Sequence, residues 1–134
     1  MSHKDELISY RRAKARETLQ DAEILFNAKR ISSAVNRIYY AIFYEVTALL
    51  LTNGMSSAKH SGIRALFNVH FVKPKKVDVE IGRFYSRMFE FRQKIDYGDF
   101  VQFEEEKVKE WLAKATQFIE DIEKVIEKEK EGKL

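Results

Sequence analysis

The chain of 134 residues has no cysteine, a single proline (Pro74) and five glycines. The lack of thiols excludes disulfides, thiolate zinc sites and a cysteine nucleophile together. So few chain breakers in a chain of this length favour long helices over many short strands. No stretch approaches the roughly 18 uninterrupted apolar residues of a membrane span, and residues 1–12 lack the apolar core of a signal peptide. We therefore expect a cytoplasmic protein.

Several chemical motifs are also missing. The sequence has no glycine-rich phosphate loop, no His-Glu-x-x-His metal motif and no Gly-x-Ser-x-Gly elbow. Imidazole chemistry is limited to His3, His60 and His70. We therefore expect no metal and no cofactor, and assign no catalytic residue. The aromatic residues lie at core spacing, so we do not interpret them as base-stacking platforms.

What is present is a globular composition, 45% hydrophobic and 34% charged, with a net charge of +3. This supports one well-filled core in a single domain over residues 1–134. The charge is uneven: residues 57–97 carry 9 basic and 4 acidic side chains, whereas residues 98–134 carry 7 and 11. Two interpretations stay open. The basic middle forms an anion-binding face, or the faces complement each other within the fold or across a dimer.

Apolar residues recur at helical spacing in five stretches, which predicts an all-α fold. The expected helices cover about residues 4–28, 33–51, 58–71, 77–96 and from just after Asp99 to about residue 127. The second stretch is apolar on every side, which is typical of a central helix. The Lys/Glu-rich residues 128–134 are expected to fray.

Helix ends are predicted from capping residues. Ser32 or Ser33 can cap the second helix, and Asn53-Gly54 can end it, since both tolerate a left-handed conformation. Asp99, with Gln102 three residues on, is the expected cap of the last helix.

Arg37 stands out because it lies in the most apolar helix, with Tyr44 on the same face. An unpaired buried guanidinium is costly, so Arg37 needs either a carboxylate from a neighbouring helix, such as Asp96 or Glu90, or an anionic ligand such as phosphate. Tyr40 joins Arg37 and Tyr44 as a candidate ligand-binding residue.

Two further groups of polar residues are candidates. Arg92 and Asp96 are four residues apart and can pair, and Tyr97 follows them. This is either a plain helix-end salt bridge or a polar pocket faced by Arg92 and Tyr97. His60 and Arg64 share a face at the start of the third helix, where exposed amides can hold an anion. The alternative is that His60 is an ordinary surface histidine.

Three ordered motifs resemble a known family. The run Ser33–Phe43 (SAVNRIYYAIF), the segment Lys59–Gly62 (KHSG) and the segment Phe89–Asp99 (FEFRQKIDYGD) are similar to landmarks of a small stand-alone branch of prokaryotic HEPN-domain proteins. The resemblance covers about residues 5–125. It implies an up-and-down four-helix bundle with an additional short helix, in a family whose members often form homodimers. It also implies a minimal nucleotidyltransferase as partner in a toxin–antitoxin-like module.

Many HEPN proteins are metal-independent RNases with an arginine followed four to six residues later by a histidine. Arg92 matches the arginine and Tyr97 a tyrosine that usually follows, but Asp96 stands near the place of the histidine. An ionised aspartate cannot exchange protons near neutrality and repels the RNA phosphate. Arg64 and His70 satisfy the spacing literally, but they lie in the wrong segment.

These observations favour a non-catalytic or degenerate HEPN domain. It would bind nucleotide, RNA or a nucleotidyltransferase through a polar groove containing Arg37, Arg92, Asp96 and Tyr97. The first alternative is an RNase that uses Arg92 with a surrogate such as His60, which requires the two residues to lie within about 10 Å of each other. The second alternative is a purely structural dimerisation module.

Overall fold

The computed structural model describes residues 2–98 and 101–132, and these residues form helices and no strand. The elements, in chain order, are α1 (His3–Asn27), α2 (Ile31–Thr52), α3 (His60–Phe67), the short π-helix η1 (Asn68–Val72), α4 (Val79–Tyr97) and α5 (Glu105–Glu131). The predicted all-α class is therefore confirmed. None of these helices combines the length and apolar character needed to cross a bilayer.

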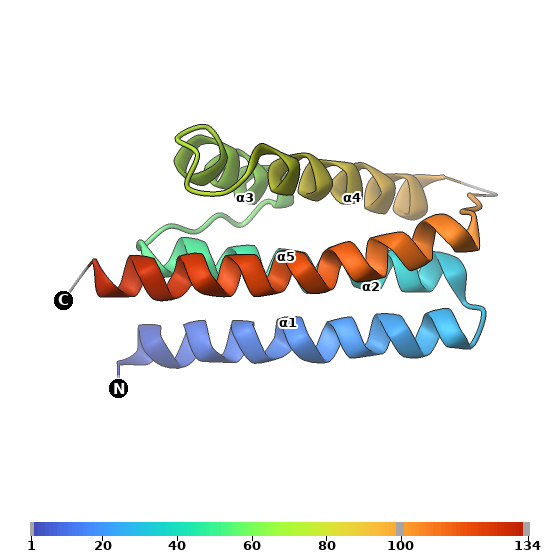
Figure 1. Cartoon of the computed structure of the whole chain (residues 1–134), viewed down its shortest axis with the longest axis horizontal. Coiled ribbons are helices and arrows are strands. Elements are labelled where there is room, and N and C mark those ends of the chain that lie inside the picture. The colour runs from blue at the N-terminus through green and yellow to red at the C-terminus, as the bar shows by residue number, and fades with distance from the viewer. Residues whose placement is uncertain (1, 99–100, 133–134) are drawn as a thin grey trace.

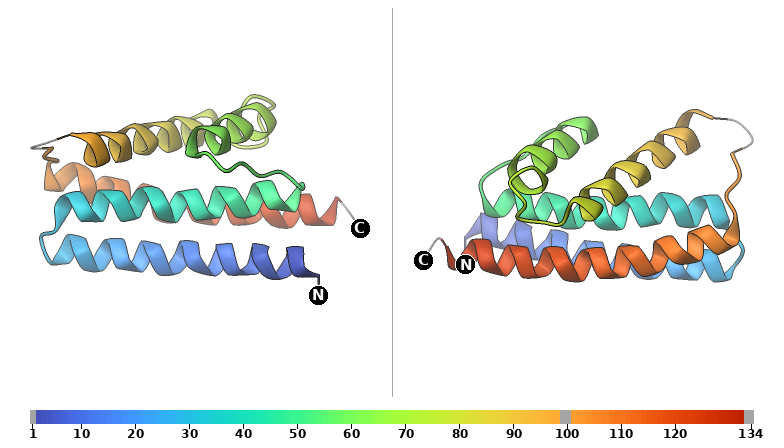
Figure 2. Two further views of the ribbon diagram at one scale, coloured as in Figure 1. Left: turned by 180° about the vertical axis from the view of Figure 1, so that it is seen from behind. Right: turned by 45° about the horizontal axis from the view of Figure 1, so that its top comes forward.

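The helices are stacked in three levels (Figure 1). Helix α1 lies along one side, α2 and α5 form the middle, and α3 and α4 cover the opposite side. The long helices α1, α2, α4 and α5 alternate in direction, which makes an up-and-down bundle. The pair α3–η1 is the additional short element, and it lies beside the beginning of α4 (Figure 2).

Helix α2 is the centre of the molecule. It packs against α1, α3, α4 and α5, and 13 of its 22 residues are buried. This is the arrangement expected of a helix that is apolar on every side, because each face needs a neighbour to exclude water. The functional candidates on α2 therefore sit where two levels of the molecule meet.

Of the two predicted ends of α2, only the C-terminal end is where the sequence placed it. The helix ends at Thr52, and Gly54 adopts a φ of +71° while the amide of Met55 donates to the carbonyl of Leu50, as expected for a glycine-terminated helix. The predicted serine cap is wrong. Helix α2 begins at Ile31, before both serines, and Ser32 instead donates to the carbonyl of Val101.

The last helix also begins later than predicted. Asp99 lies outside the described residues, and α5 starts at Glu105, preceded by non-helical residues 101–104. Phe103 explains the delay, because its ring packs against Phe91 at 5.4 Å and Trp111 at 5.8 Å between ring centroids. Glu104, the residue just before the helix, has an extended backbone. At its other end α5 continues as helix to Glu131, past the point where the sequence suggested fraying.

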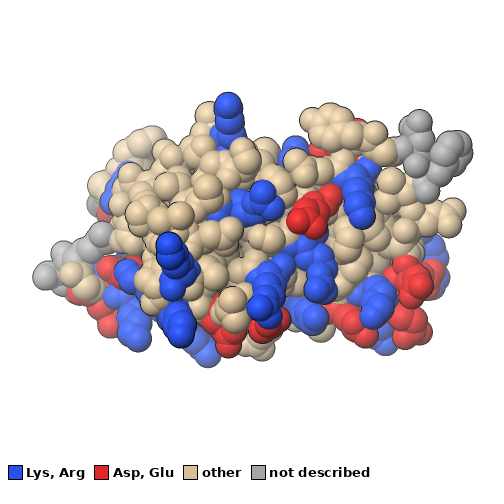
Figure 3. Space-filling view, turned by 90° about the horizontal axis from the view of Figure 1, so that it is seen from above, with Lys and Arg blue, Asp and Glu red and all other residues tan. Residues whose placement is uncertain are grey.

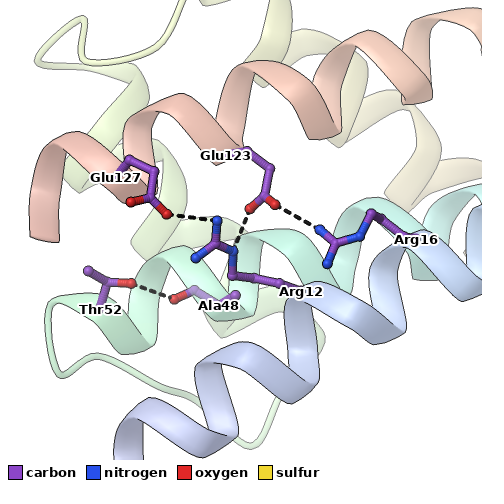
Figure 4. A network of polar contacts seen from close by, with 6 residues as sticks. All are labelled: Arg12, Arg16, Ala48, Thr52, Glu123 and Glu127. Atoms are coloured by element: carbon purple, nitrogen blue, oxygen red, sulfur yellow. Dashed lines mark hydrogen bonds and ion pairs between the residues drawn. The ribbon is translucent and has the colours of Figure 1, made fainter.

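A charged network joins α1 to α5 beside α2 (Figure 4). Arg12 pairs with Glu123 at 2.7 Å and with Glu127 at 2.9 Å, and Arg16 pairs with Glu123 at 2.8 Å. Glu45 of α2 is fully buried next to this network. Burial and the neighbouring Glu123 raise the pKa of the Glu45 carboxyl to about 9, so this carboxyl is neutral at physiological pH.

Candidate functional site

The candidate site forms where α2, the start of α3 and α4 meet. The hydroxyl of Tyr39 on α2 is hydrogen-bonded to Nδ1 of His60, the first residue of α3, at 2.8 Å. The imidazole also stacks on Phe43, with ring centroids 4.5 Å apart and an interplanar angle of 26°. These two contacts hold the histidine against α2, so His60 is a positioned residue rather than an ordinary surface histidine.

Three guanidinium groups lie against aromatic rings at this site. Arg37 of α2 and Arg92 of α4 both lie against Tyr40, with their Cζ atoms 4.8 and 5.8 Å from its ring centroid. The Cζ of Arg92 is also 5.7 Å from the Tyr39 ring. Such contacts between a cation and the face of an aromatic ring are attractive and orient the guanidinium plane.

The third arginine comes from α3. The Cζ of Arg64 lies 4.1 Å from the centroid of Phe89, whose ring packs edge-on against Tyr39 at 6.2 Å. We call this set of residues the arginine–tyrosine cluster; its members are Arg37, Tyr39, Tyr40, His60, Arg64, Phe89 and Arg92.

The cluster carries more positive than negative charge. Arg92 pairs with Asp96 one turn later on α4, with 3.0 Å between Nε and Oδ2. Within residues 2–98 and 101–132 neither Arg37 nor Arg64 forms an ion pair. Arg37 is instead held by its neighbour Asn36, whose Oδ1 accepts from Nε and Nη2 at 3.2 and 2.8 Å. Among the residues that the structure describes, Arg37 therefore has no carboxylate partner of the kind that a purely structural role would supply.

The protonation of the cluster follows from its burial. Burial and the charge of Arg92 lower the pKa of His60, while Asp96 acts in the opposite direction. Burial raises the pKa of Tyr39 to about 12. At neutral pH the histidine is therefore uncharged and the tyrosine is protonated. A neutral imidazole next to a fixed arginine can donate or accept a proton at its second nitrogen.

Six of the eight residues proposed from the sequence meet here: Arg37, Tyr40, His60, Arg64, Arg92 and Asp96. Tyr44 lies next to them, with its ring 6.2 Å from Tyr40. Tyr97 does not join them: its side chain is 87% exposed and lines a separate hollow with Glu90 and Lys94. Arg92 is not among the residues that line this hollow.

Sequence reasoning missed the residues on which the cluster is built. Tyr39 and Phe89 are buried, at 0% and 3% exposure, and neither is among the candidate residues that the sequence suggests. Their role as the surfaces on which arginines lie depends on contacts between helices. The adjacent pair Tyr39-Tyr40, two residues after Arg37 in a mainly apolar helix, was the available signal.

The side of the molecule covered by α3 and α4, the helices that carry His60, Arg64 and Arg92, is basic. Figure 3 shows the side covered by α3 and α4, across which basic side chains outnumber acidic ones. This agrees with the charge of residues 57–97, most of which lie on this side. The acidic side chains of α5 that face α1 are partly neutralised by Arg12 and Arg16.

Comparison with known proteins supports the resemblance seen in the motifs. The HEPN domain family matches residues 8–125 of the chain. The chain belongs to the HEPN domain family.

A UPF0332 protein of Thermotoga maritima is 56% identical over 127 residues, covering 95% of this chain and 96% of its own length. Two proteins of Methanocaldococcus jannaschii, each described as a "Putative toxin", are 34% and 36% identical. Each match covers 84% of this HEPN domain, and 77% and 83% of the respective relatives. The similarity therefore extends over most of each protein. A match of this length spans the segment from Arg37 to Arg92, which contains the cluster residues of α2, α3 and α4.

Proposed function

We propose that this HEPN domain binds RNA through phosphate groups held at the arginine–tyrosine cluster. The observation that supports this most directly is the convergence of Arg37, Arg64 and Arg92 on Tyr39, Tyr40 and Phe89, with Asp96 as the paired counter-charge. A guanidinium presents a planar set of donors that fits a phosphate group. Because the aromatic rings fix these planes in advance, little side-chain entropy is lost on binding.

Asp96 has a defined part in this proposal. Its carboxylate engages Nε of Arg92, which leaves the terminal nitrogens of that guanidinium for a ligand. The pair thereby orients Arg92, whereas Arg37 and Arg64 have no ion-pair partner among residues 2–98 and 101–132 and supply the excess positive charge. A nucleotide offers the same phosphate chemistry as RNA, and the excess of basic residues in 57–97, the segment that contributes His60, Arg64 and Arg92, favours the longer anion.

The biological setting we propose is a toxin–antitoxin-like module. Its support is the similarity to two archaeal proteins that carry the words "Putative toxin" in their descriptions. We also propose that the domain forms a homodimer and pairs with a minimal nucleotidyltransferase, as the family resemblance implies. Copurification with the product of a neighbouring nucleotidyltransferase gene would test the pairing.

The binding proposal is tested by replacing one cluster arginine and one matched arginine outside the cluster. Arg92→Ala should weaken binding of a short single-stranded RNA, measured by fluorescence anisotropy. It should also reduce the slope of log affinity against log salt concentration by about 0.7, the value for one phosphate contact with a single strand. Arg83→Ala, on the same helix, removes an exposed cation that pairs with Glu80 and should have little effect.

Equal losses in the two variants would contradict the proposal, because they would indicate a general effect of net charge. Circular dichroism of both variants checks that the helices remain. Arg37→Ala provides a second member of the cluster, and unchanged RNA and nucleotide binding in that variant would favour the purely structural alternative.

A second candidate function is metal-independent RNA cleavage, with His60 in place of the histidine that is missing near Asp96. The specific observation in its favour is that His60 and Arg92 both lie against Tyr39 and Tyr40, and that Arg92 acts on the pKa of His60. In the tautomer whose Nδ1–H donates to Tyr39, Nε2 can accept the proton of a ribose 2′-hydroxyl as its oxygen attacks the adjacent phosphorus. The bond from phosphorus to the 5′ oxygen then breaks to leave a 2′,3′-cyclic phosphate, and the imidazolium returns the proton to the departing 5′ oxygen. The RNA in the binding samples can be checked for cleavage. Cleavage that both His60→Ala and Arg92→Ala abolish would show that the domain is an RNase, whereas RNA that stays intact supports the non-catalytic function.

A further inference from the structure

A groove lies next to the arginine–tyrosine cluster, between the first part of α1, the outer side of α2 and the loop that leads into α3. Its volume is about 390 Å³. Its walls carry three aromatic rings, from Tyr10, Phe43 and Tyr44, and its polar groups include Arg11 and Ser57. Figure 2 (left) looks onto this side, with α2 in front between α1 and α3.

The groove and the cluster share a wall. Phe43 lines the groove and stacks on His60 at 4.5 Å. Tyr44 lines the groove and contacts both Phe43, at 5.8 Å between centroids, and Tyr40, at 6.2 Å. The groove and the cluster are therefore neighbours, with the rings of Phe43 and Tyr44 between them.

The aromatic rings that line the groove keep part of their surface exposed. Tyr10 is 60% exposed on α1, and Phe43 and Tyr44 are half-buried. The sequence spacing had suggested core positions for the aromatic residues of α2, and the structure instead leaves this part of their surface open to a ligand. An exposed tyrosine at the edge of an aromatic wall gives a planar ligand a surface on which to stack.

The polar groups of the groove are held in place. Nη1 of Arg11 donates to the hydroxyl of Thr47 at 3.0 Å, which uses one of its five donors. The loop residue Ser57 packs closely on α3: a Cβ atom at Gly62 would lie 2.1 Å from the Ser57 hydroxyl oxygen. The glycine thus lets the loop close this end of the groove next to His60.

We propose that this groove is a subsite for an unpaired base of the RNA whose phosphate is bound at the cluster. The inference rests on the proposed RNA binding and specifies its substrate class as single-stranded RNA. Aromatic side chains stack with any base, because every base has a π-face, and single-stranded RNA is generally recognised in this way. Along α2, Arg37 and Thr47 are ten residues apart, a rise of about 15 Å, so the cluster and the groove together accommodate more than one phosphate.

The test compares three probes on the purified protein: a short single-stranded oligouridylate, an abasic ribose-phosphate oligomer of the same length, and a duplex RNA. The oligouridylate should bind most tightly. Tyr10→Ala and Tyr44→Ala should each weaken its binding about tenfold, the usual loss for one base stacked on one ring. Binding of the abasic oligomer should be the same in both variants as in the unsubstituted protein. Tyr97→Ala, which removes an exposed tyrosine outside the groove, is the control and should bind all probes normally.

Two results would overturn the subsite while leaving phosphate binding intact. One is equal affinity of the unsubstituted protein for the oligouridylate and the abasic oligomer. The other is a loss of self-association in Tyr10→Ala, seen by sedimentation, which would show that a second copy of the chain covers the groove. If none of the probes binds, the proposed function itself fails. Tyr10→Ala removes a largely exposed side chain, so its effect is interpretable even if Tyr44→Ala does not fold.

Discussion

Glu45 on α2 is the residue whose environment differs most from its ordinary preference. Its side chain is fully buried, and the charged groups that face it are Arg12 and Arg16 of α1 and Glu123 of α5. The two arginines are engaged by Glu123, whose pKa is lowered although its own partial burial acts in the opposite direction. The pKa of Glu45, by contrast, is raised to about 9. The folded protein therefore holds a proton at Glu45 that the unfolded chain releases near pH 4.5.

Glu45→Gln should stabilise the protein at pH 8. A folded-state pKa above the unfolded value contributes stability that is fully present below pH 4.5 and is lost progressively as the pH rises toward 9. Glutamine keeps the shape of the protonated acid without this loss. We expect the variant to exceed the unsubstituted protein by about 1–3 kcal/mol in free energy of unfolding at pH 8, with the difference shrinking toward pH 5. Urea unfolding followed across this pH range measures it.

Glu120→Gln on the exposed side of α5 is the matched control and should leave the pH profile unchanged. A Glu45→Gln variant that is less stable at pH 8 would contradict the prediction. That result would mean that the Glu45 carboxylate is ionised and stabilised by Arg12 and Arg16.

At the scale of the elements, periodicity was sufficient to predict the helices but not where they begin. The spacing of apolar residues located all five, and the glycine-terminated end of α2 was predictable because its signal is local. The start of α5 was not, because it depends on how Phe103 packs against Phe91 and Trp111, and Phe91 lies on α4. Local capping preference yields when such tertiary contacts hold a segment extended.

Some features of the candidate site could likewise be predicted from the sequence, and others could not. Arg37, His60 and Arg92 were recognisable as polar residues in apolar or motif-bearing surroundings. The Tyr39–His60 hydrogen bond was not predictable, since it joins residues 21 positions apart on two helices. Nor could the sequence separate Tyr97 from Arg92, because that distinction depends on which side of α4 faces α2.

The position of α3 and η1 depends on one small residue of α4. A Cβ atom at Gly82 would lie 2.8 and 2.9 Å from the two methyl carbons of Val72 in η1. Gly82→Ala should therefore destabilise the protein by about 1–3 kcal/mol, although alanine is ordinarily about 1 kcal/mol better than glycine inside a helix. Valine is stiff at χ1 and cannot turn away without cost. Chemical unfolding of the purified variant measures the change.

A double variant supplies the control for this close contact. Val72→Ala removes the methyl groups that would clash, so Gly82→Ala should cost much less, or even stabilise, when introduced into the Val72→Ala background. An ordinary stabilisation by Gly82→Ala in the unsubstituted protein would show that η1 moves freely relative to α4. The position of His60 against Tyr39 of α2 would then not depend on the contact between Gly82 and Val72.

At the scale of the whole molecule, the three levels share one central helix. Helix α2 packs against α1 and α5 on one side and against α3 and α4 on the other, so neither side can lose its neighbours without exposing α2. A chain of this size with a common core is expected to unfold in one cooperative step. The single tryptophan, Trp111, can report on this, because its ring stacks on Phe91 of α4 at 4.7 Å.

Urea unfolding followed by Trp111 fluorescence and by far-ultraviolet circular dichroism should give superimposable transitions with one midpoint. Fluorescence senses the contact between α5 and α4, whereas circular dichroism senses all the helices. Glu45→Gln adds a more demanding comparison, since it acts where α1, α2 and α5 meet and should shift both transitions equally at pH 8. A fluorescence midpoint at lower urea, unmoved by Glu45→Gln, would mean that α4 detaches first and carries Arg92 away from His60. The arginine–tyrosine cluster would then be a site that opens by local unfolding, because two of its three arginines and its histidine lie on α3 and α4.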